Sequence, residues 1–294
     1  MAGTEPGTEP GVGNGTALVL GGGGLTGIGW EIGMLAGLAE AGVELAGADL
    51  VIGTSAGSIV GAHLAARSST PDELYTRQLA APERRPGARM GAVAMARFVT
   101  IAVRSRSTAS FGLRMGRLAL SARTVPEAEQ RAAIARTLES ADWPARPLVI
   151  TAVDAATGER HTFDATSGVS LVDAVTASCA VPGVFPPVTL DGQRWIDGGV
   201  HSTANADLAA GYGRVVVIAP MAVSGGPIAG PRSQGEALAR QGARVCVVTP
   251  DREARAAFGR NVLDPAKRAD AARAGRRQSA VHAEEIRRVW SDRP

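Results

Sequence analysis

Short, continuous apolar runs recur along the chain and alternate with longer stretches in which apolar residues repeat at helical spacing. Strands that are covered by helices on both faces consist of such runs, because neither side of the strand meets water. Five runs fit this description: residues 16–20, 49–52, 147–153, 214–219 and 244–248. The pattern predicts an α/β fold, a three-layer sandwich whose mainly parallel central sheet carries helices on both faces.

The stretches between these runs predict helices with recognisable start signals. Thr70 and Ser170 each precede a helical pattern, and both residue types cap helix N-termini. The expected helices are 28–41, 58–66, 71–79, 126–138, 171–178 and a last one from residue 265 toward Trp290. The other expected strands are 160–163 and a hairpin of 188–190 with 193–196 around an Asp191-Gly192 turn.

The overall composition limits the classes of protein to which the chain can belong. The chain has 294 residues, of which 45% are hydrophobic and 20% charged, and we expect residues 16–294 to form one globular domain. Residues 1–15 are rich in Gly, Pro, Thr and Glu and lack an apolar segment, which predicts a disordered tail and no signal peptide. Residues 221–235, rich in Gly, Pro and Ser, are expected to form a loop. Two cysteines, Cys179 and Cys246, are too few for a disulfide framework, which favours a cytoplasmic protein.

The charge of the chain argues against binding to nucleic acid. The formal net charge is only +3, and the sequence has neither zinc-ligand spacing nor a basic patch interleaved with aromatic residues. Residues 84–123 stand apart, because they hold nine arginines among apolar residues and no acidic residue. Two interpretations remain open for this segment. It is either a helical cap that contacts anionic lipid headgroups at a membrane surface, or a pair of ordinary surface helices with arginines in solvent.

A serine follows the second apolar run in a characteristic motif. Residues 49–52 lead into Gly53-Thr54-Ser55-Ala56-Gly57, a G-x-S-x-G sequence, and a helical stretch comes next. A strand, a sharp turn with a central serine and a helix together form a nucleophile elbow, which lifts the hydroxyl above the sheet edge. The helix N-terminus there favours a developing negative charge. The motif alone also fits a plain strand-to-helix turn in which Ser55 only caps the helix.

The glycine-rich stretch after the first run admits three interpretations. Residues 21–27 read GGGGLTG between a strand and a helix, which fits the G-x-G-x-x-G pattern of a dinucleotide-binding loop. That pattern requires an acidic residue at the end of the second strand, whereas Asp49 lies at its beginning. Alternatively, glycine amides form an oxyanion hole beside Ser55, or the stretch is a tight loop without a ligand. The following helix has glycines at every fourth position, which predicts the close approach of another element: Gly29, Gly33 and Gly37.

Three blocks in this order resemble the patatin-like phospholipase family. They are the glycine loop after the first strand, the G-x-S-x-G around Ser55, and Asp197-Gly198-Gly199 directly after a short strand. The stretches 151–158 and 177–187 are similar to the family as well, so the resemblance covers roughly residues 16–220. Three ordered blocks in the right local context are far more specific than any one of them.

The resemblance implies a patatin-like fold and a serine-dependent lipid acyl hydrolase that cleaves fatty-acyl esters through an acyl-enzyme. It implies a catalytic Ser-Asp dyad, with Ser55 as nucleophile and Asp197 as base, and an oxyanion hole built from Gly22, Gly23 and Gly24. It implies no metal or organic cofactor, and its substrate would be a lipid or another ester. In such a dyad the carboxylate must gain basicity through close contact and partial desolvation, which raises its pKa.

A Ser-His-Asp triad is the other arrangement that the sequence allows. The chain has four histidines: His63, His161, His201 and His282. Of these, His201 is the serious candidate because it follows Asp197 by four residues. We expect Asp154 to be structural and to brace a loop near the site.

One position departs from the family pattern. Thr26 stands where the family commonly has Arg or Lys, and a missing cation could weaken transition-state stabilisation or the order of the loop. Two alternatives to the hydrolase therefore stay open: a catalytically weak patatin-like scaffold, and a dinucleotide-binding protein that uses residues 21–27. We expect a cytoplasmic protein, and one of the two interpretations of residues 84–123 adds a peripheral contact with the membrane.

Overall fold

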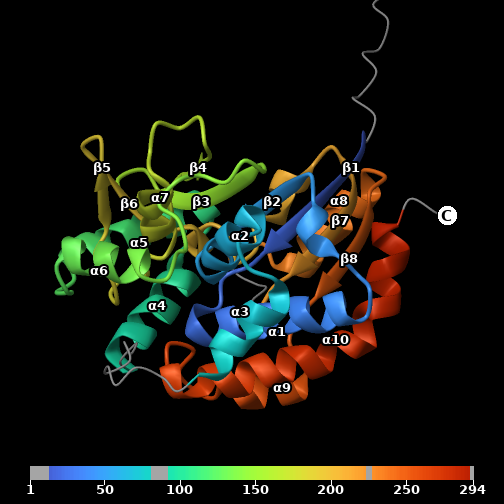
Figure 1. Cartoon of the computed structure of the whole chain (residues 1–294). Helices are drawn as coiled ribbons and strands as arrows, with labels where there is room; N and C mark the ends of the chain where they lie inside the picture. Colours follow the sequence, from blue (N-terminus) through green and yellow to red (C-terminus); the bar gives the residue numbers. More distant parts are fainter. Residues whose placement is uncertain (1–12, 81–91, 223–226, 292–294) are drawn as a thin grey trace, which may run out of the picture.

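A computed structural model describes residues 13–80, 92–222 and 227–291 of the chain. Within this part, eight strands form one sheet in the order β5-β6-β3-β2-β1-β7-β8, with β4 paired to β3 (Figure 1). The strands are β1 (Gly13–Leu20), β2 (Leu50–Gly53), β3 (Leu148–Asp154), β4 (Arg160–Phe163), β5 (Val188–Leu190), β6 (Gln193–Asp197), β7 (Tyr212–Ile218) and β8 (Arg244–Val248).

Most neighbouring strands run parallel, from β3 through β2, β1 and β7 to β8. The strands β4 and β6 pair with β3 in the antiparallel sense, and so does β5 with β6. The chain moves from β1 to one side through β2 and β3, and it returns on the other side of β1 with β7. In such sheets, ligands bind at the carboxyl ends of the strands around the point where the order reverses. The loops after β1 and β2 therefore lie where a site is expected.

Helices cover both faces of the sheet, which confirms the predicted three-layer α/β class. The larger group packs on one face: α1 (Gly24–Glu40), α2 (Ala56–Ala66), α7 (Leu171–Ser178) and α10 (Arg268–Trp290), with α3 (Pro71–Leu79), α6 (Glu127–Ala135) and α9 (Arg252–Phe258) against them. The other face carries α5 (Thr108–Ser121) and α8 (Pro231–Arg240), and α4 (Ala92–Arg104) packs on α5. Among the described residues, no helix has the length and apolar character that crossing a bilayer requires.

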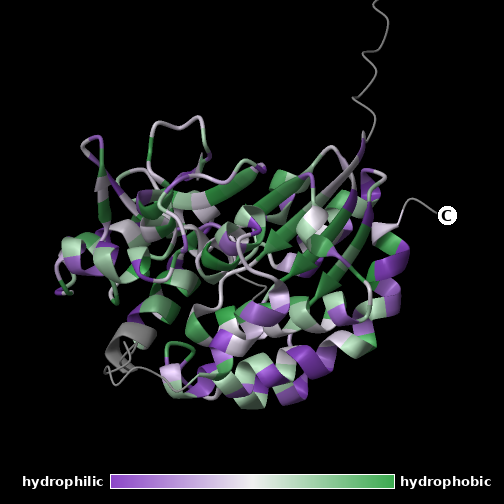
Figure 2. Cartoon of the chain, viewed as in Figure 1, coloured by the Kyte–Doolittle hydropathy of each residue, from purple (hydrophilic) through white to green (hydrophobic). Residues whose placement is uncertain are grey.

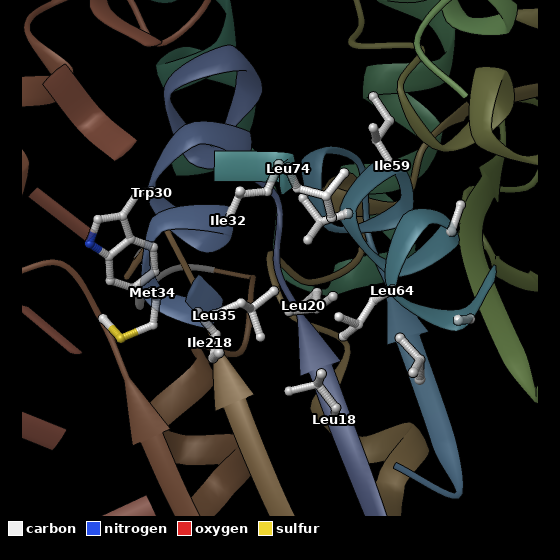
Figure 3. Close-up of a cluster of buried hydrophobic side chains, with 14 of the residues drawn as sticks. Leu18, Leu20, Trp30, Ile32, Met34, Leu35, Ile59, Leu64, Leu74 and Ile218 are labelled. Atoms are coloured by element: carbon white, nitrogen blue, oxygen red, sulfur yellow. The ribbon is translucent and has the colours of Figure 1, made fainter. Parts of the chain in front are cut away.

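The alternation of side chains along β1 divides the core into two layers. Leu18 and Leu20 join the larger cluster beneath α1 and α2, where Leu35 and Leu64 lie close to them (Figure 3). Their neighbour Val19 faces the opposite layer. The central parallel strands are mainly hydrophobic, whereas α10 is largely hydrophilic (Figure 2). Burial on both faces explains why these strands are continuous apolar runs in the sequence.

Helices α1 and α10 approach each other closely, as the glycines at every fourth position of α1 predict. A methyl group on Gly33 would lie 2.0 Å from the Ala272 carbonyl oxygen, and one on Gly29 would lie 2.5 Å from that of Arg268. Any larger residue at these positions would push the helices apart. This packing fixes α1 against its neighbour, and with it the glycine loop at the N-terminus of α1.

The structure corrects three predicted boundaries. β1 begins at Gly13, whose amide bonds to the Gly211 carbonyl oxygen, so residues 13–15 belong to the sheet and not to a tail; residues 1–12 lie outside the described part. α8 begins at Pro231, so the predicted loop 221–235 was wrong over its last residues. Proline suits this first helical position because the missing N–H would be unpaired there anyway. α1 begins at Gly24, inside the glycine run and before the predicted start.

Candidate active site

Ser55 occupies a sharp turn between β2 and α2. Its backbone has φ 52° and ψ −115°, a conformation that residues other than glycine rarely adopt. Both flanking glycines are required. A methyl group on Gly57 would lie 2.1 Å from the Leu20 carbonyl oxygen, and one on Gly53 would lie 2.6 Å from Ser58 Cα. This strained strand-turn-helix geometry is that of a nucleophile elbow.

The end of α7 and the first turn of α2 hold the backbone of the elbow. The Ser55 N–H group donates to Ser178 Oγ at 2.8 Å. The Ser55 carbonyl oxygen accepts from the Ser58 hydroxyl at 2.6 Å and from the Cys179 thiol at 3.4 Å. Burial raises the pKa of Cys179 to about 12, so the thiol stays protonated and acts as a donor. These bonds fix the Ser55 main chain without using its hydroxyl.

Asp197 ends β6 beside the elbow. Its N–H group donates to the Ala180 carbonyl oxygen at 3.0 Å, and its Oδ1 accepts from Gly199 N–H at 2.7 Å. Its Oδ2 is buried and has no hydrogen-bond partner of normal geometry among the described residues. The Ser55 hydroxyl is nevertheless close enough to the Asp197 carboxylate to favour its charged form. The structure thus brings the serine of the second block and the aspartate of the third block together.

Two opposing effects set the basicity of Asp197. The pKa of the carboxyl is raised from 3.8 to about 6, chiefly by burial, because removal from water disfavours the charge. The Ser55 hydroxyl and the Gly199 amide act in the other direction, since both stabilise the anion. The carboxylate is therefore ionised at neutral pH and more basic than a free aspartate. These are the properties that a general base requires.

The amides of the glycine loop differ in whether they have a hydrogen-bond acceptor. Gly22 N–H donates to the Thr203 carbonyl oxygen at 2.7 Å, so it is not free to bind an oxyanion, which corrects the prediction for this residue. Within the described residues, the amides of Gly23 and Gly24 have no acceptor, and neither does that of Ala56, the first residue of α2. The loop still lies against the serine, because a methyl group on Gly22 would be 3.5 Å from Ser55 Cβ.

A buried asparagine joins the elbow to the turn after Asp197. Asn205 Nδ2 lies 3.0 Å from Thr54 Oγ1 and 3.3 Å from the Gly198 carbonyl oxygen. Thr54 Oγ1 in turn lies 2.9 Å from Thr151 Oγ1 of β3. Asn205 has φ 54°, a left-handed conformation that asparagine tolerates better than most residues. Sequence reasoning missed this residue, and this tolerance is the only local signal for it.

The loop around Asn205 also reaches the glycine loop. Thr203, two residues earlier, is the residue whose carbonyl oxygen accepts from Gly22 N–H. The Ser202 hydroxyl accepts from Asn205 N–H at 3.0 Å and contacts Gln234 Oε1 of α8 at 3.0 Å. Residues 202–205 therefore connect the elbow, the Asp197 turn and the glycine loop in one hydrogen-bonded unit.

The histidines lie in other surroundings, and in the described structure none has a hydrogen bond or ion pair with Ser55 or Asp197. His201 is half-buried near Arg160 and Asp207, and its pKa is lowered first by burial and then by the Arg160 charge. The other three contact different groups. His63 Nδ1 lies 3.9 Å from Glu139 Oε2, and His282 Nδ1 lies 3.8 Å from Glu285 Oε2. The His161 ring meets that of Phe163 edge to face and packs at a tilt against that of Trp195. This arrangement does not favour a Ser-His-Asp triad.

Two other aspartates brace the backbone. Asp49 Oδ2 accepts from the Thr16 N–H group at 2.7 Å and from its hydroxyl at 2.8 Å, and these bonds lower the pKa of Asp49. Asp49 thus lies at the amino end of β2, away from the glycine loop, which weakens the dinucleotide interpretation. Asp154 Oδ1 accepts from the amides of Ala156 and Thr157, which confirms its predicted structural role.

Thr26 forms a hydrogen bond between the glycine loop and the segment that precedes α10. It is fully buried, and its N–H group donates to the Val262 carbonyl oxygen at 3.0 Å. A methyl group on Gly24 would lie 2.8 Å from the same oxygen. The segment before α10 therefore packs directly on the glycine loop. The Thr26 backbone amide makes the shorter bond of this contact, and its hydroxyl lies 3.4 Å from the same oxygen.

The mainly parallel sheet with a strained serine turn at its carboxyl edge places the chain in the class of α/β proteins with a strand-turn-helix serine elbow. Within this class, the family model for patatin-like phospholipase matches residues 18–210, and the chain belongs to that family. The match spans all three blocks that carry the resemblance in the sequence. Family membership makes the protein a lipid ester hydrolase by class.

Two solved structures are similar to the chain at low sequence identity. VipD from Legionella pneumophila is 14% identical, with a TM-score of 0.47 over 93% of this chain and 67% of that chain. The type III effector protein ExoU is 15% identical, with a TM-score of 0.42 over 94% of this chain and 53% of that chain. The chain thus spans about two thirds and about half of the lengths of these two proteins, and the family assignment rests on the family model.

Proposed function

We propose that the protein hydrolyses fatty-acyl esters of lipids through a Ser55–Asp197 dyad and an acyl-enzyme. One observation carries the proposal. The Ser55 hydroxyl lies close enough to the buried Asp197 carboxylate to lower its pKa, the carboxylate's Oδ2 has no hydrogen-bond partner among the described residues, and burial keeps its pKa raised to about 6. Membership of the patatin-like phospholipase family supports a lipid ester as the substrate.

In the proposed reaction, Ser55 Oγ attacks the ester carbonyl carbon while its proton passes to Asp197 Oδ2. The tetrahedral intermediate then collapses, Asp197 gives the proton to the departing alcohol, and the acyl group stays on Ser55. In the second half, Asp197 takes a proton from water, and the resulting hydroxide attacks the acyl carbon. The fatty acid leaves, and Ser55 recovers its proton from Asp197.

The proposed oxyanion donors are the amides of Gly23, Gly24 and Ala56. Gly24 and Ala56 are the first residues of α1 and α2, so two helix N-termini with their partial positive charge converge beside Ser55. Backbone donors of this kind typically contribute a factor of about 10² to 10³ each in kcat. This set replaces Gly22, whose amide is bonded to Thr203.

Replacement of the serine tests the proposal. Ser55→Ala should abolish turnover of p-nitrophenyl butyrate and labelling by a fluorophosphonate probe while the circular dichroism spectrum stays unchanged. Ser279→Ala is the matched control, because Ser279 is a buried serine of α10 whose hydroxyl donates to the Arg276 carbonyl oxygen at 2.8 Å. Turnover that survives in Ser55→Ala, or labelling of another serine, would refute the assignment.

The two alternatives make different predictions. A dinucleotide-binding protein would show NAD⁺ or NADH binding by calorimetry, and Ser55 would not react with the fluorophosphonate. A patatin-like scaffold would keep its fold but hydrolyse no ester of any chain length. Cytoplasmic location and peripheral membrane contact stay predictions, and the membrane contact is developed below.

A further inference from the structure

The α4–α5 hairpin, residues 96–123, carries positive charge without compensating negative charge. It contains no acidic residue, and in the described part of the chain none of its arginines forms an ion pair with Asp or Glu. Uncompensated like charges repel one another and attract an anionic partner. The arginines are Arg97, Arg104, Arg106, Arg114, Arg117 and Arg123.

The same hairpin exposes large apolar side chains. Val99 and Val103 are 54% and 81% exposed, and they share one face of α4 because they are four residues apart. The opposite face of α4 is packed, since the Phe98 and Phe111 rings meet at 5.6 Å. Leu120 of α5 is 48% exposed. Exposed valines beside arginines are typical of helices that lie in the interface of a membrane.

Three of the arginines converge where α4 turns into α5. Arg104, Arg106 and Arg114 line an open hollow of about 560 Å³ together with Val103 and Ser110. The guanidinium group binds phosphate oxygens through paired N–H donors, which favours a phosphate over a monovalent halide or a neutral ligand. Val103 beside the hollow supplies an apolar contact next to the charged one.

The hairpin rests on the segment that carries Asp197. Phe111 and Met115 of α5 pack with Ile196 and Val200, which flank Asp197 on both sides in the sequence. Figure 1 shows α4 and α5 at the end of the sheet where β3 and β6 lie. The hairpin therefore packs directly on an element that builds the candidate active site.

We propose that the α4–α5 hairpin docks the protein on an anionic membrane. Arg104, Arg106 and Arg114 bind the phosphate groups of anionic phospholipids, and Val99 and Val103 enter the border of the acyl region. This docking rests on the proposed function, because it places a lipid hydrolase on the surface that holds its substrate. The proposal also limits the membrane contact that was expected for residues 84–123 to the hairpin, residues 96–123. Residues 84–91 lie outside the described part.

Co-sedimentation of the purified full chain with vesicles tests the docking surface. One vesicle set is pure phosphatidylcholine, and the other contains roughly one third phosphatidylglycerol, which makes the surface anionic. The hairpin variant combines Arg104→Ala, Arg106→Ala and Arg114→Ala. The control removes the same charge from exposed arginines elsewhere: Arg136→Ala, Arg240→Ala and Arg252→Ala.

Each arginine near an anionic surface contributes about fivefold to the partition coefficient. We therefore expect the hairpin variant to lose roughly 100-fold in binding to anionic vesicles and the control variant to lose less than about threefold. An equal loss in both variants, or unchanged binding by the hairpin variant, would overturn the proposal. Displacement from vesicles by millimolar glycerol phosphate at constant ionic strength would reveal a site for soluble phosphates and would overturn it as well.

A water-soluble ester separates docking from catalysis. The hairpin variant should turn over p-nitrophenyl butyrate normally and lose turnover of phosphatidylglycerol in vesicles, because none of the three arginines has a hydrogen bond or ion pair with Ser55 or Asp197 in the described structure. Equal losses on both substrates would point to a folding defect and contradict the proposal. If the wild-type chain binds anionic vesicles but hydrolyses no ester, the proposed function fails and the docking surface stands.

Discussion

The candidate active site and the α4–α5 hairpin differ in the burial and the bonding of their polar side chains. At the site, polar side chains are buried and bonded to one another, and Asn205 Nδ2 alone lies within 3.3 Å of four oxygen atoms. On the hairpin, arginines face solvent beside exposed valines, without ion-pair partners in the described chain. Buried, satisfied polar groups fix a geometry, whereas exposed unpaired charges are suited to a partner outside the protein.

One polar atom of the site is buried without being bonded. Asp197 Oδ2 is a buried oxygen without a regular hydrogen bond among the described residues, and it belongs to the carboxylate that the Ser55 hydroxyl approaches. An unsatisfied buried acceptor is costly and persists where function requires it. The comparison therefore predicts two classes of variant. Changes at the site should affect soluble and vesicle substrates alike, whereas changes on the hairpin should affect vesicle substrates alone.

After the Ser55→Ala change described above, Asp197→Asn should have the largest effect on catalysis. It removes the proposed base and keeps the shape of the side chain, so kcat for p-nitrophenyl butyrate should fall by about a thousandfold or more. Glu31→Gln is the matched control, because Glu31 is a fully buried carboxyl of α1 whose pKa burial raises well above its usual range. Glu31 has no hydrogen bond or ion pair with Ser55 or Asp197 in the described structure, so the amide should keep kcat close to wild type. A small effect of Asp197→Asn would argue against the dyad.

The same substitution should stabilise the fold. A buried Asp whose pKa rises from 3.8 to about 6 lowers the free energy of unfolding by about 2–3 kcal/mol once it is ionised. The penalty is absent below about pH 4, grows through about pH 6 and is complete above it. Urea unfolding should show Asp197→Asn more stable than wild type at pH 8 and equal to it in acid. Equal stability at both pH values would contradict the raised pKa.

Asn205→Ala tests whether the hydrogen-bonded unit positions the reacting groups. It leaves Thr54 Oγ1 and the Gly198 carbonyl oxygen without their shared donor, and the loss of a buried hydrogen-bond partner costs about 1–3 kcal/mol. If this free energy is lost from the positioning of the reacting groups, kcat should fall by roughly 5- to 150-fold. We expect KM for the soluble ester to stay nearly constant. Thr54→Val, which removes one member of the network, should have a smaller effect in the same direction.

A positional role for Asn205 differs from simple loss of folded protein. Titration with the fluorophosphonate counts competent sites, so kcat per labelled site should fall in Asn205→Ala. If the number of labelled sites falls while kcat per site is unchanged, Asn205 acts only on stability. Vesicle binding serves as the second control, because the hairpin lies outside this network and should bind anionic vesicles as before.

Local signals account for the parts of the fold that the sequence predicts. At Asp191-Gly192 both residues have positive φ, 48° and 77°, as the hairpin turn between β5 and β6 requires. Thr70 caps α3 and forms a capping box with Glu73. At Ser55, the serine and the two glycines that flank it at a distance of two residues define the elbow within five residues. In each case, the residues that decide the conformation are neighbours in the sequence.

Contacts between distant segments account for what the sequence could not predict. The Thr203 carbonyl oxygen decides where the Gly22 amide points, and the two residues lie on different loops. Asn205 gains its importance from Thr54 and Gly198, which the fold alone brings to it. The start of α8 at Pro231 was hidden because the surrounding composition is that of a loop. Spacing and propensity contain no information about such pairings.

The pH dependence of catalysis should follow Asp197 and not the hairpin. Only the ionised carboxylate accepts the Ser55 proton, so kcat/KM for the soluble ester should fall below about pH 6 and be about tenfold lower at pH 5. Binding to anionic vesicles depends on guanidinium groups, which keep their charge in this range. Parallel losses of turnover and vesicle binding between pH 7 and pH 5 would contradict this separation.

Val103→Ser should have the smallest effect, and it tests whether the exposed apolar residues of the hairpin contribute to vesicle binding. Val103 is 81% exposed, so the free energy of unfolding should change by less than about 0.5 kcal/mol. The matched change Val153→Ser lies in the core between α5 and the sheet and should cost about 2–4 kcal/mol. If Val103 enters the membrane border, its loss should weaken vesicle partition by roughly fivefold on neutral and anionic vesicles alike. A loss of stability without a change in partition would instead mean that Val103 packs against the protein itself.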